Sequence, residues 1–158
     1  MKPSRYPALV GFLAASFTAA AIGGAATATS VTTWYRALHK PAWNPPDWIF
    51  GPVWTLLYVL MAVAAWRVWR RSEPDEARRT LGLFTGQLAL NAIWSVLFFG
   101  LRQPGAAFAE VILFWASLVF LLVRFWRTDR VAAAMWSPYV AWVSFASVLN
   151  GTVWWLNR

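Results

Sequence analysis

Residues 34–54 read WYRALHKPAWNPPDWIFGPVW and hold four tryptophans and four prolines. Because proline lacks a backbone N–H and fixes φ, the Pro45-Pro46 pair can neither continue a helix nor pair within a central strand. We expect this segment to be a stiff, irregular loop, aromatic enough to lie at a membrane interface or over a pocket. The chain is apolar on both sides of it, so the loop separates two candidate membrane spans.

Outward from this loop the chain is apolar almost throughout. Of its 158 residues, 59% are hydrophobic and 13% are charged, about half the ~25% charge of a soluble domain. Charged boundaries mark five apolar stretches, residues 8–29, 49–66, 81–101, 106–123 and 131–156, each near the ~20 residues that cross a bilayer. Short connections make neighbouring helices antiparallel. The sequence therefore predicts one all-α domain, residues 1–158: a five-transmembrane-helix bundle with a structured first extramembrane loop.

The basic residues lie at the ends of these stretches. The net charge is +8, but without a basic stripe the pattern favours a membrane protein, and we expect no nucleic-acid partner. The N-terminus and the second and fourth loops hold ten Lys and Arg residues, and the other side holds four. For an inner or plasma membrane, the positive-inside rule places the N-terminus in the cytoplasm, with the first loop and the C-terminus on the opposite side.

The first apolar stretch has two interpretations. Lys2 and Arg5 before it, with small residues at 25–28, resemble a secretory signal peptide. The run is long for a signal peptide, however, and small residues recur in it at every fourth position, which suits close helix packing in lipid. These residues are Gly11, Ala15, Ala19 and Gly23. We expect a retained first helix.

Three spans carry polar and aromatic residues on one helical face. These residues are Trp54, Tyr58 and Met61; Gln87, Asn91, Trp94 and Phe98; and Tyr139, Trp142, Ala146 and Asn150. A polar side chain in lipid is costly unless it faces a partner or a ligand. The amides could simply join helices by hydrogen bonds. Beside large rings, they also suit a mainly apolar cavity for a flat, hydrophobic ligand.

Few other residues could carry chemistry. The chain has no cysteine and one histidine, which excludes disulfides, thiolate sites and multi-histidine clusters, and we expect no metal site. Glu110 could relay protons or contact a substrate, but an interfacial acid paired with Arg102 is favoured. His39 could ligate haem iron, although a hydrogen-bonding role is favoured. Gly82 and Gly86 form one GxxxG turn, a weak signal for helix contact or dimerisation.

Several separate motifs resemble one known family. They are Trp34-Tyr35, Leu38, Lys40-Pro41, Trp43, Pro45-Pro46, Trp48, Phe50, Val53-Trp54 and Leu57-Tyr58; Gln87-Leu88, Leu90-Asn91, Trp94-Ser95 and Phe98-Phe99-Gly100; and Pro138-Tyr139, Trp142, Phe145-Ala146 and Leu149-Asn150. In this order and spacing they resemble the TspO/MBR family, the translocator proteins. The resemblance runs from Trp34 to Asn150 and rests on several agreeing motifs, which makes it specific.

The resemblance implies a five-helix membrane bundle, often a homodimer, whose pocket is closed by the first extramembrane loop. Family members bind porphyrins such as protoporphyrin IX and haem as ligands, with no obligatory cofactor, and also sterols and benzodiazepine-like compounds. Carried over by motif, the ligand-binding residues are Trp43, Trp54, Tyr58, Asn91, Trp94, Trp142, Ala146 and Asn150, joined by Gln87 and Tyr139 from the helix faces. Residues 150–158 lack the tyrosine of the sterol-recognition element proposed for animal members, which argues against sterol binding by that route.

Three functions follow from this resemblance. The favoured one is a membrane binding protein for porphyrins or haem in tetrapyrrole sensing or regulation. Some bacterial members promote light-dependent oxidative breakdown of porphyrin, which would use Trp54 and Trp142 here. The expected pocket holds no acid–base pair, nucleophile or metal cluster, so a conventional enzyme is not expected. The third function is translocation of porphyrin or sterol. The sequence shows no inverted repeat and no intramembrane charge pair that would support a transporter.

Overall fold

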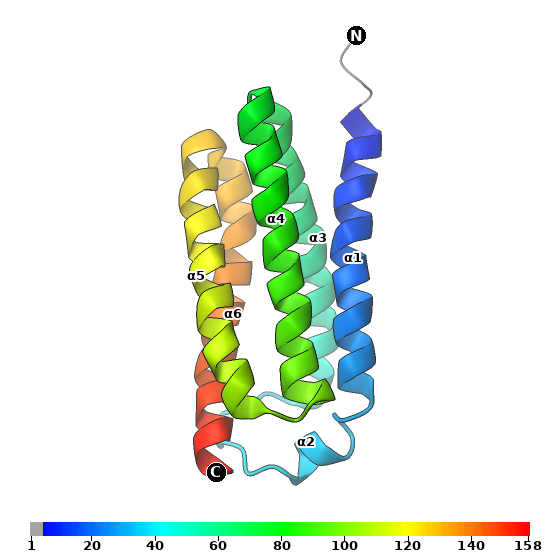
Figure 1. Ribbon diagram of the computed structural model, residues 1–158, viewed down its shortest axis with the longest axis vertical. Coiled ribbons are helices and arrows are strands. Elements are labelled where there is room, and N and C mark those ends of the chain that lie inside the picture. Colours follow the sequence, from blue (N-terminus) through cyan, green and yellow to red (C-terminus); the bar gives the residue numbers. More distant parts are fainter. Residues whose placement is uncertain (1–4) are drawn as a thin grey trace.

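The computed structural model describes residues 5–158, and in that range the chain forms a bundle of five long helices (Figure 1). These are α1 (Arg5–Ala28), α3 (Asp47–Arg71), α4 (Pro74–Ser95), α5 (Pro104–Thr128) and α6 (Arg130–Leu156). A one-turn helix, α2 (Trp34–Ala37), lies in the first loop, and a π-helical turn, η1 (Val96–Gly100), continues α4. All five long helices are long and apolar enough to cross a membrane. The predicted all-α membrane bundle is confirmed.

The helices extend beyond the apolar stretches from which they were predicted. α3 continues past residue 66 to Arg71, α5 continues past residue 123 to Thr128, and α4 begins at Pro74 instead of residue 81. A helix of 25 residues is about 37 Å long, against ~30 Å of hydrocarbon. The charged end turns therefore reach the interface, where hydropathy no longer marks the helix.

The first loop is shorter than its aromatic sequence predicts. α3 already begins at Asp47, directly after Pro46, and contains Pro52. The irregular loop expected from residue 34 therefore ends at Pro46 and contains one helical turn, and the span predicted from residue 49 begins two residues earlier, at Asp47. Pro52 is the sixth residue of α3 and lies beyond its first turn, so it removes the N–H that would otherwise bond to the Trp48 carbonyl.

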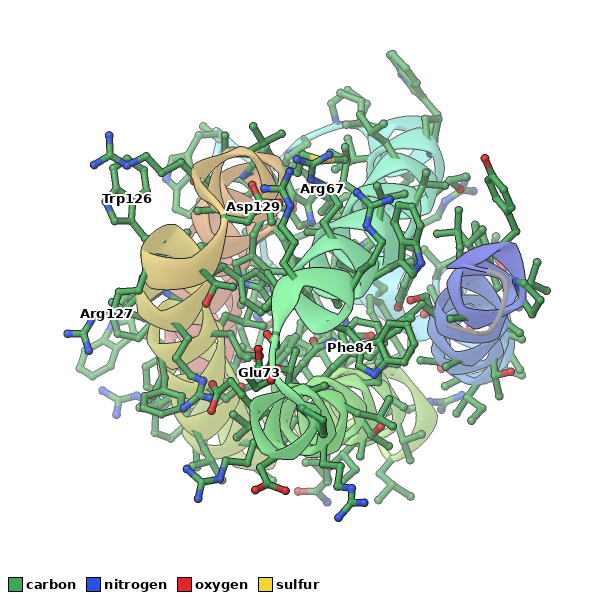
Figure 2. The ribbon with its side chains drawn as sticks, turned by 90° about the horizontal axis from the view of Figure 1, so that it is seen from above. Arg67, Glu73, Phe84, Trp126, Arg127 and Asp129 are labelled. Carbon is green, nitrogen blue, oxygen red and sulfur yellow. The ribbon has the colours of Figure 1, made fainter. Side chains whose placement is uncertain are left out.

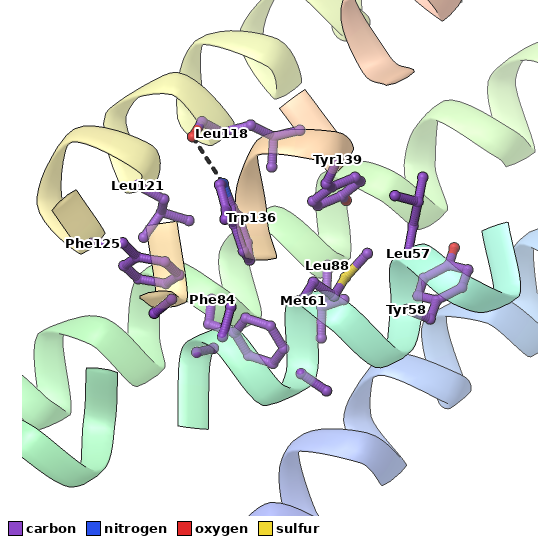
Figure 3. Close-up of a cluster of buried hydrophobic side chains, with 14 of the residues drawn as sticks. Leu57, Tyr58, Met61, Phe84, Leu88, Leu118, Leu121, Phe125, Trp136 and Tyr139 are labelled. Carbon is purple, nitrogen blue, oxygen red and sulfur yellow. Dashed lines mark hydrogen bonds between the residues drawn. The ribbon is translucent and has the colours of Figure 1, made fainter. Parts of the chain in front are cut away.

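Each long helix packs against at least two others. α5 packs along α6, α3 packs against both α6 and α4, and α1 packs on α3 and α4 at one edge (Figures 1 and 2). We call the end with residues 29–46 and the C-terminus the lid end, and the end with the α3–α4 and α5–α6 turns the basic end. The basic-end half is filled by large buried side chains around Trp136, whose Nε1 donates to the Leu118 carbonyl at 3.1 Å (Figure 3).

The small-residue seam expected on α1 is correct only toward the lid end. Gly11 and Ala15 face outward, and nothing lies within 4 Å of a Cβ added at Gly11. The buried stripe is instead Phe12, Ser16, Ala19 and Gly23. Its spacing of four, three and four follows one helical face more closely than a strict repeat of four.

Candidate functional site

A cavity of about 630 Å³ lies in the lid-end half of the bundle. Its walls come from α1, α3, α4, η1 and α6, and Val31 and Tyr35 of the first loop lie over its end. This volume falls within the range of small-molecule sites, about 300–1,000 Å³. The packed core around Trp136 belongs to the opposite half, so the bundle is solid toward the basic end and hollow toward the lid end.

Aromatic rings make up much of the wall. Three ring pairs are Trp54 with Tyr58, Trp94 with Phe98, and Trp142 with Phe50, at centroid separations of 5.7, 5.6 and 5.8 Å. The Trp94 and Phe98 rings are stacked. Because each ring contacts another, the rings are held in fixed orientations and can offer flat apolar surface to a ligand.

The π-helical turn η1 brings two consecutive rings to the cavity. Phe98 and Phe99 both line it, and the Leu101 amide donates to the Val96 carbonyl at 2.7 Å. Regular α-helical spacing predicts only Phe98 on this face. Phe99 was missed because no local sequence pattern marks a π turn, a feature that recurs at functional sites.

The structure brings six of the ten predicted ligand-binding residues to the cavity wall. They are Trp54, Tyr58, Trp94, Trp142, Ala146 and Asn150. The two tryptophans predicted to take part in photochemistry, Trp54 and Trp142, are among them. The other four, Trp43, Gln87, Asn91 and Tyr139, lie outside the wall.

Gln87, Asn91 and Tyr139 form a buried hydrogen-bond network beneath the cavity. The Tyr58 hydroxyl donates to Asn91 Oδ1 at 2.6 Å, and Asn91 Nδ2 donates to the Tyr139 hydroxyl at 2.9 Å. The Tyr139 hydroxyl in turn donates to Gln87 Oε1 at 2.8 Å. These hydrogen bonds join α3, α4 and α6, as the simpler interpretation of the sequence held, and Tyr58 is the member of the network that also lines the cavity.

Trp43 lies on the outside of the lid. It is 48% exposed and packs on Phe145, with ring centroids 5.8 Å apart. The side chain that closes the cavity is Tyr35, which is 4% exposed and donates to Asn44 Oδ1 at 2.9 Å. Burial, with a contribution from the Asp47 charge, raises the pKa of Tyr35 to about 12 despite the hydrogen bond to Asn44. The hydroxyl therefore remains a neutral donor.

Hydrogen bonds fix the lid to the bundle on both sides. The Ser30 hydroxyl donates to the Phe99 carbonyl at 2.6 Å. The His39 backbone amide donates to Asn157 Oδ1, and Asn157 Nδ2 donates back to the His39 carbonyl, both at 2.9 Å. Lys40 Nζ donates to three backbone carbonyls of residues 35–38, the shortest at 2.6 Å. The lid is thus closed and anchored to η1 and to the C-terminal end of α6.

α1 contributes a wall that the sequence did not reveal. Its residues at the cavity include Ala20, Ala21, Gly24, Thr27 and Ala28. Small residues in a membrane helix predict close packing, and here several of them leave space instead. Small residues that pack closely against a neighbouring helix and small residues that leave room for a cavity therefore give the same sequence pattern.

Most polar groups at the cavity already have protein partners. Asn150 Oδ1 accepts from Trp94 Nε1 at 3.0 Å, and Asn150 Nδ2 donates to the Pro104 carbonyl at 2.8 Å. Trp142 Nε1, in contrast, is buried with no hydrogen-bond partner within residues 5–158. The wall is therefore mainly apolar and aromatic, and its few polar groups include Asp47, Asn150, several hydroxyls and Trp142 Nε1.

Glu110 does not form the interfacial pair expected for it. Both of its carboxylate oxygens are buried without a hydrogen-bond partner in the described part of the chain, so the prediction of an ion pair with Arg102 is wrong. Glu110 also lies outside the cavity wall. Across residues 5–158, no group of three or more His, Asp or Glu side chains could hold a metal ion.

Comparison with known proteins gives a consistent result. The chain matches the TspO/MBR family over residues 12–156. It is 40% identical over 139 residues to the tryptophan-rich protein TspO of Chlorobaculum tepidum, covering 85% of this chain and 86% of that protein. It is 37% identical over 156 residues to the translocator protein of Homo sapiens, covering 98% and 92%. Protein CrtK of Rhodobacter capsulatus is 39% identical over 143 residues, 89% of each chain.

The five apolar helices and these matches agree along nearly the whole chain. The protein is a multi-pass integral membrane protein and belongs to the TspO/MBR family.

Proposed function

We propose that this protein binds a flat tetrapyrrole of the porphyrin class, such as protoporphyrin IX or haem, in the lid-end cavity, and that it serves tetrapyrrole sensing or regulation. The observation that carries the proposal is a cavity of about 630 Å³ walled by ring pairs from α3, α4, η1 and α6. Membership of a family of membrane ligand-binding proteins supports it.

The wall favours recognition by stacking and shape. Its amide, Asn150, is already bonded to Trp94 and Pro104. The hydroxyls of Thr27 and Thr55 donate to carbonyls of their own helices, at 2.8 and 2.9 Å. A ligand with a large apolar plane gains most from such a site, because aromatic contacts stabilise it without competing for these hydrogen bonds.

A dark titration tests the proposal. Purified protein is titrated with protoporphyrin IX, and binding is followed by the absorption of the porphyrin, so that loss of one tryptophan does not alter the signal. Trp54→Phe and Trp142→Phe each remove part of a wall ring and should weaken binding about 3- to 10-fold. Trp126→Phe, at an exposed ring of the basic end, is the matched control. Equal affinity in all four proteins would overturn the site.

Light-dependent breakdown of the bound porphyrin is a second candidate function. It is favoured by the position of both Trp54 and Trp142 in the cavity wall, since an indole in contact with an excited porphyrin can donate an electron to it. Porphyrin absorption should then fall only under illumination, in the presence of dioxygen, and only with both tryptophans present. Loss of absorption in the dark would contradict this function, and flux into vesicles without ligand loss would favour translocation.

The same cavity is proposed to admit sterols or benzodiazepine-like ligands. Each is tested by displacement of protoporphyrin IX, and a compound that leaves the porphyrin bound at saturation is not a ligand of this site.

A homodimer through α4 is also proposed. Gly82 and Gly86 are exposed, and nothing lies within 4 Å of a Cβ added at either one, which would let a second copy approach closely. Gly82→Leu should shift the protein toward monomer in light scattering, with Gly11→Leu as the control. A dimer that persists in Gly82→Leu would place the interface elsewhere.

A further inference from the structure

We propose that ligands reach the cavity sideways from the bilayer, through a gap between α1 and α3, while the lid stays closed. The inference rests on the proposed function in one respect, that the cavity takes a membrane-dissolved ligand. The expected ligand is a hydrophobic compound that partitions into the hydrocarbon of the bilayer before it binds to the protein.

The position of the exposed wall residues carries the inference. Every cavity-lining residue that is also exposed on the outer surface belongs to α1 or α3. On α1 they are Phe17, Ala21, Gly24 and Ala28. On α3 they are Asp47, Gly51 and Thr55. The wall residues from α4, η1 and α6 are buried or half-buried, so the cavity meets the outer surface along one side.

The two rows face each other as the edges of one opening. Each row follows helical spacing, and because α1 and α3 are antiparallel, Ala28 and Asp47 lie toward the lid while Phe17 lies deeper. Nothing lies within 4 Å of a Cβ added at Gly24 or Gly51. The Phe17 and Tyr58 rings, 6.2 Å apart, bound the opening at its deep end.

The opening lies along the apolar spans of α1 and α3, Tyr6–Ala28 and Asp47–Arg71. From residue 17 to residue 28, α1 rises about 16 Å, roughly half of the ~30 Å apolar thickness. Its rim offers little polarity there, since the Thr55 hydroxyl donates to the Gly51 carbonyl of its own helix. The one carboxylate, Asp47, lies at the lid end, with an oxygen 4.0 Å from Arg36 Nε. A dissolved aromatic ligand would therefore lose no hydrogen bonds on passing between the helices.

The lid, in contrast, gives no route in its closed form. Tyr35 covers the cavity from that end, and the Ser30, His39 and Asn157 hydrogen bonds hold the loop to the bundle. Access through the lid would require several of these bonds to break together. Access between α1 and α3 requires only side-chain motion at Phe17 and its neighbours.

Labelling of a thiol inside the cavity tests the route without porphyrin. The chain has no cysteine, so Ala146→Cys, on the wall contributed by α6, supplies the sole thiol. The protein is reconstituted into vesicles whose bilayer contains pyrene maleimide, a flat aromatic thiol reagent, and adduct formation is followed by fluorescence and mass. In this background Gly24→Leu and Gly51→Leu fill the gap. Gly11→Leu, an open glycine of the same helix away from the cavity, is the matched control.

We expect Gly24→Leu and Gly51→Leu each to slow labelling about tenfold or more, with Gly11→Leu unchanged. Asn157→Ala, which removes the two hydrogen bonds between His39 and Asn157, should leave the rate unchanged. Parent-rate labelling in both gap variants, labelling several-fold faster in Asn157→Ala, or no labelling of the parent would overturn the inference.

Circular dichroism checks that the gap variants fold, and a several-fold faster rate in Asn157→Ala would overturn the inference even if they do not. A protein that labels as expected but fails to bind protoporphyrin IX would overturn the proposed function and leave the access route standing.

Discussion

Asp129 should be the most sensitive single position at the basic end. It is the only residue between α5 and α6, and its side chain is buried beside Arg67 (Figure 2). Its Oδ2 lies 3.0 Å from Arg67 Nε and 2.9 Å from Arg71 Nη1, and its Oδ1 accepts from the Val131 and Ala132 amides at 3.0 and 3.3 Å. One carboxylate thus joins α3 to the α5–α6 turn and caps α6.

Two substitutions separate these roles. Asp129→Asn removes the charge but keeps a good N-cap residue, and it should lower the free energy of unfolding by about 1–2 kcal/mol. The value is modest because the Arg67 and Arg71 side chains are 22% and 46% exposed, and solvent screens such pairs. Asp129→Ala also loses the cap and should cost about 1 kcal/mol more.

The pH dependence follows from the pKa of Asp129. Burial alone raises this pKa, but hydrogen bonds from Arg67 and the Ala132 amide and the charges of Arg67 and Arg71 hold it below its usual value of 3.8. A carboxyl whose pKa is lowered in the folded state stabilises fully above its unfolded pKa, and this stability is lost as the pH falls through the folded value. The stability difference between the parent and Asp129→Asn should be constant from about pH 8 to about pH 5 and shrink below about pH 4.

Chemical unfolding in mild detergent, followed by far-UV circular dichroism between pH 3 and pH 8, measures this difference. Glu73→Gln is the matched control, because Glu73 is an exposed carboxylate at the N-cap of α4 that makes no capping hydrogen bond. The reasoning is refuted if Asp129→Asn and Asp129→Ala are equally stable, or if their deficit relative to the parent grows as the pH is lowered.

Three further predictions concern other parts of the bundle. Asn91→Leu leaves the Tyr58 hydroxyl without its acceptor and removes one of the two partners of the Tyr139 hydroxyl, which keeps its bond to Gln87. It should cost about 1–2 kcal/mol of unfolding free energy, and less in a Tyr58→Phe background; equal costs in both backgrounds would contradict the network. Glu110→Gln removes an ionisable group whose oxygens have no partner and should raise the melting temperature, whereas a lower one would mean that the carboxylate has an unrecognised partner. In intact cells, an impermeant maleimide should label Ala42→Cys, and Thr128→Cys only after permeabilisation; the reverse would invert the topology.

The fold was largely predictable because a bilayer imposes strict length and polarity on each span. The five helices follow from apolar length alone. The ends of the helices could not be predicted in this way. Residues 67–71 and 74–80 are helical, but they carry charges that indicate a loop in a hydropathy pattern. Residues 49–54 belong both to the proline-rich and aromatic run and to the span predicted from residue 49, and the structure places them in the first turns of α3.

The site was predictable only for residues whose type is informative. Trp54, Trp94 and Trp142 are large rings on polar faces, and they line the cavity. α1 lines it with alanine and glycine, which carry no signature that separates a wall from a packing seam. Phe99 depends on a π turn that regular spacing cannot predict.

The buried amides show why polar residues in a membrane helix are poor guides to a ligand. With no water in the hydrocarbon, an unpaired amide is costly, so the fold pairs each one during assembly. Gln87 and Asn91 are bonded to tyrosines, and Asn150 is bonded to Trp94 and Pro104. The side-chain amides therefore form hydrogen bonds between helices and are not free to bind a ligand. The cavity wall consists mainly of aromatic rings and small residues. If the proposed function and access route hold, such a cavity would distinguish ligands by planarity and size, and a ligand would enter it from the lipid between α1 and α3.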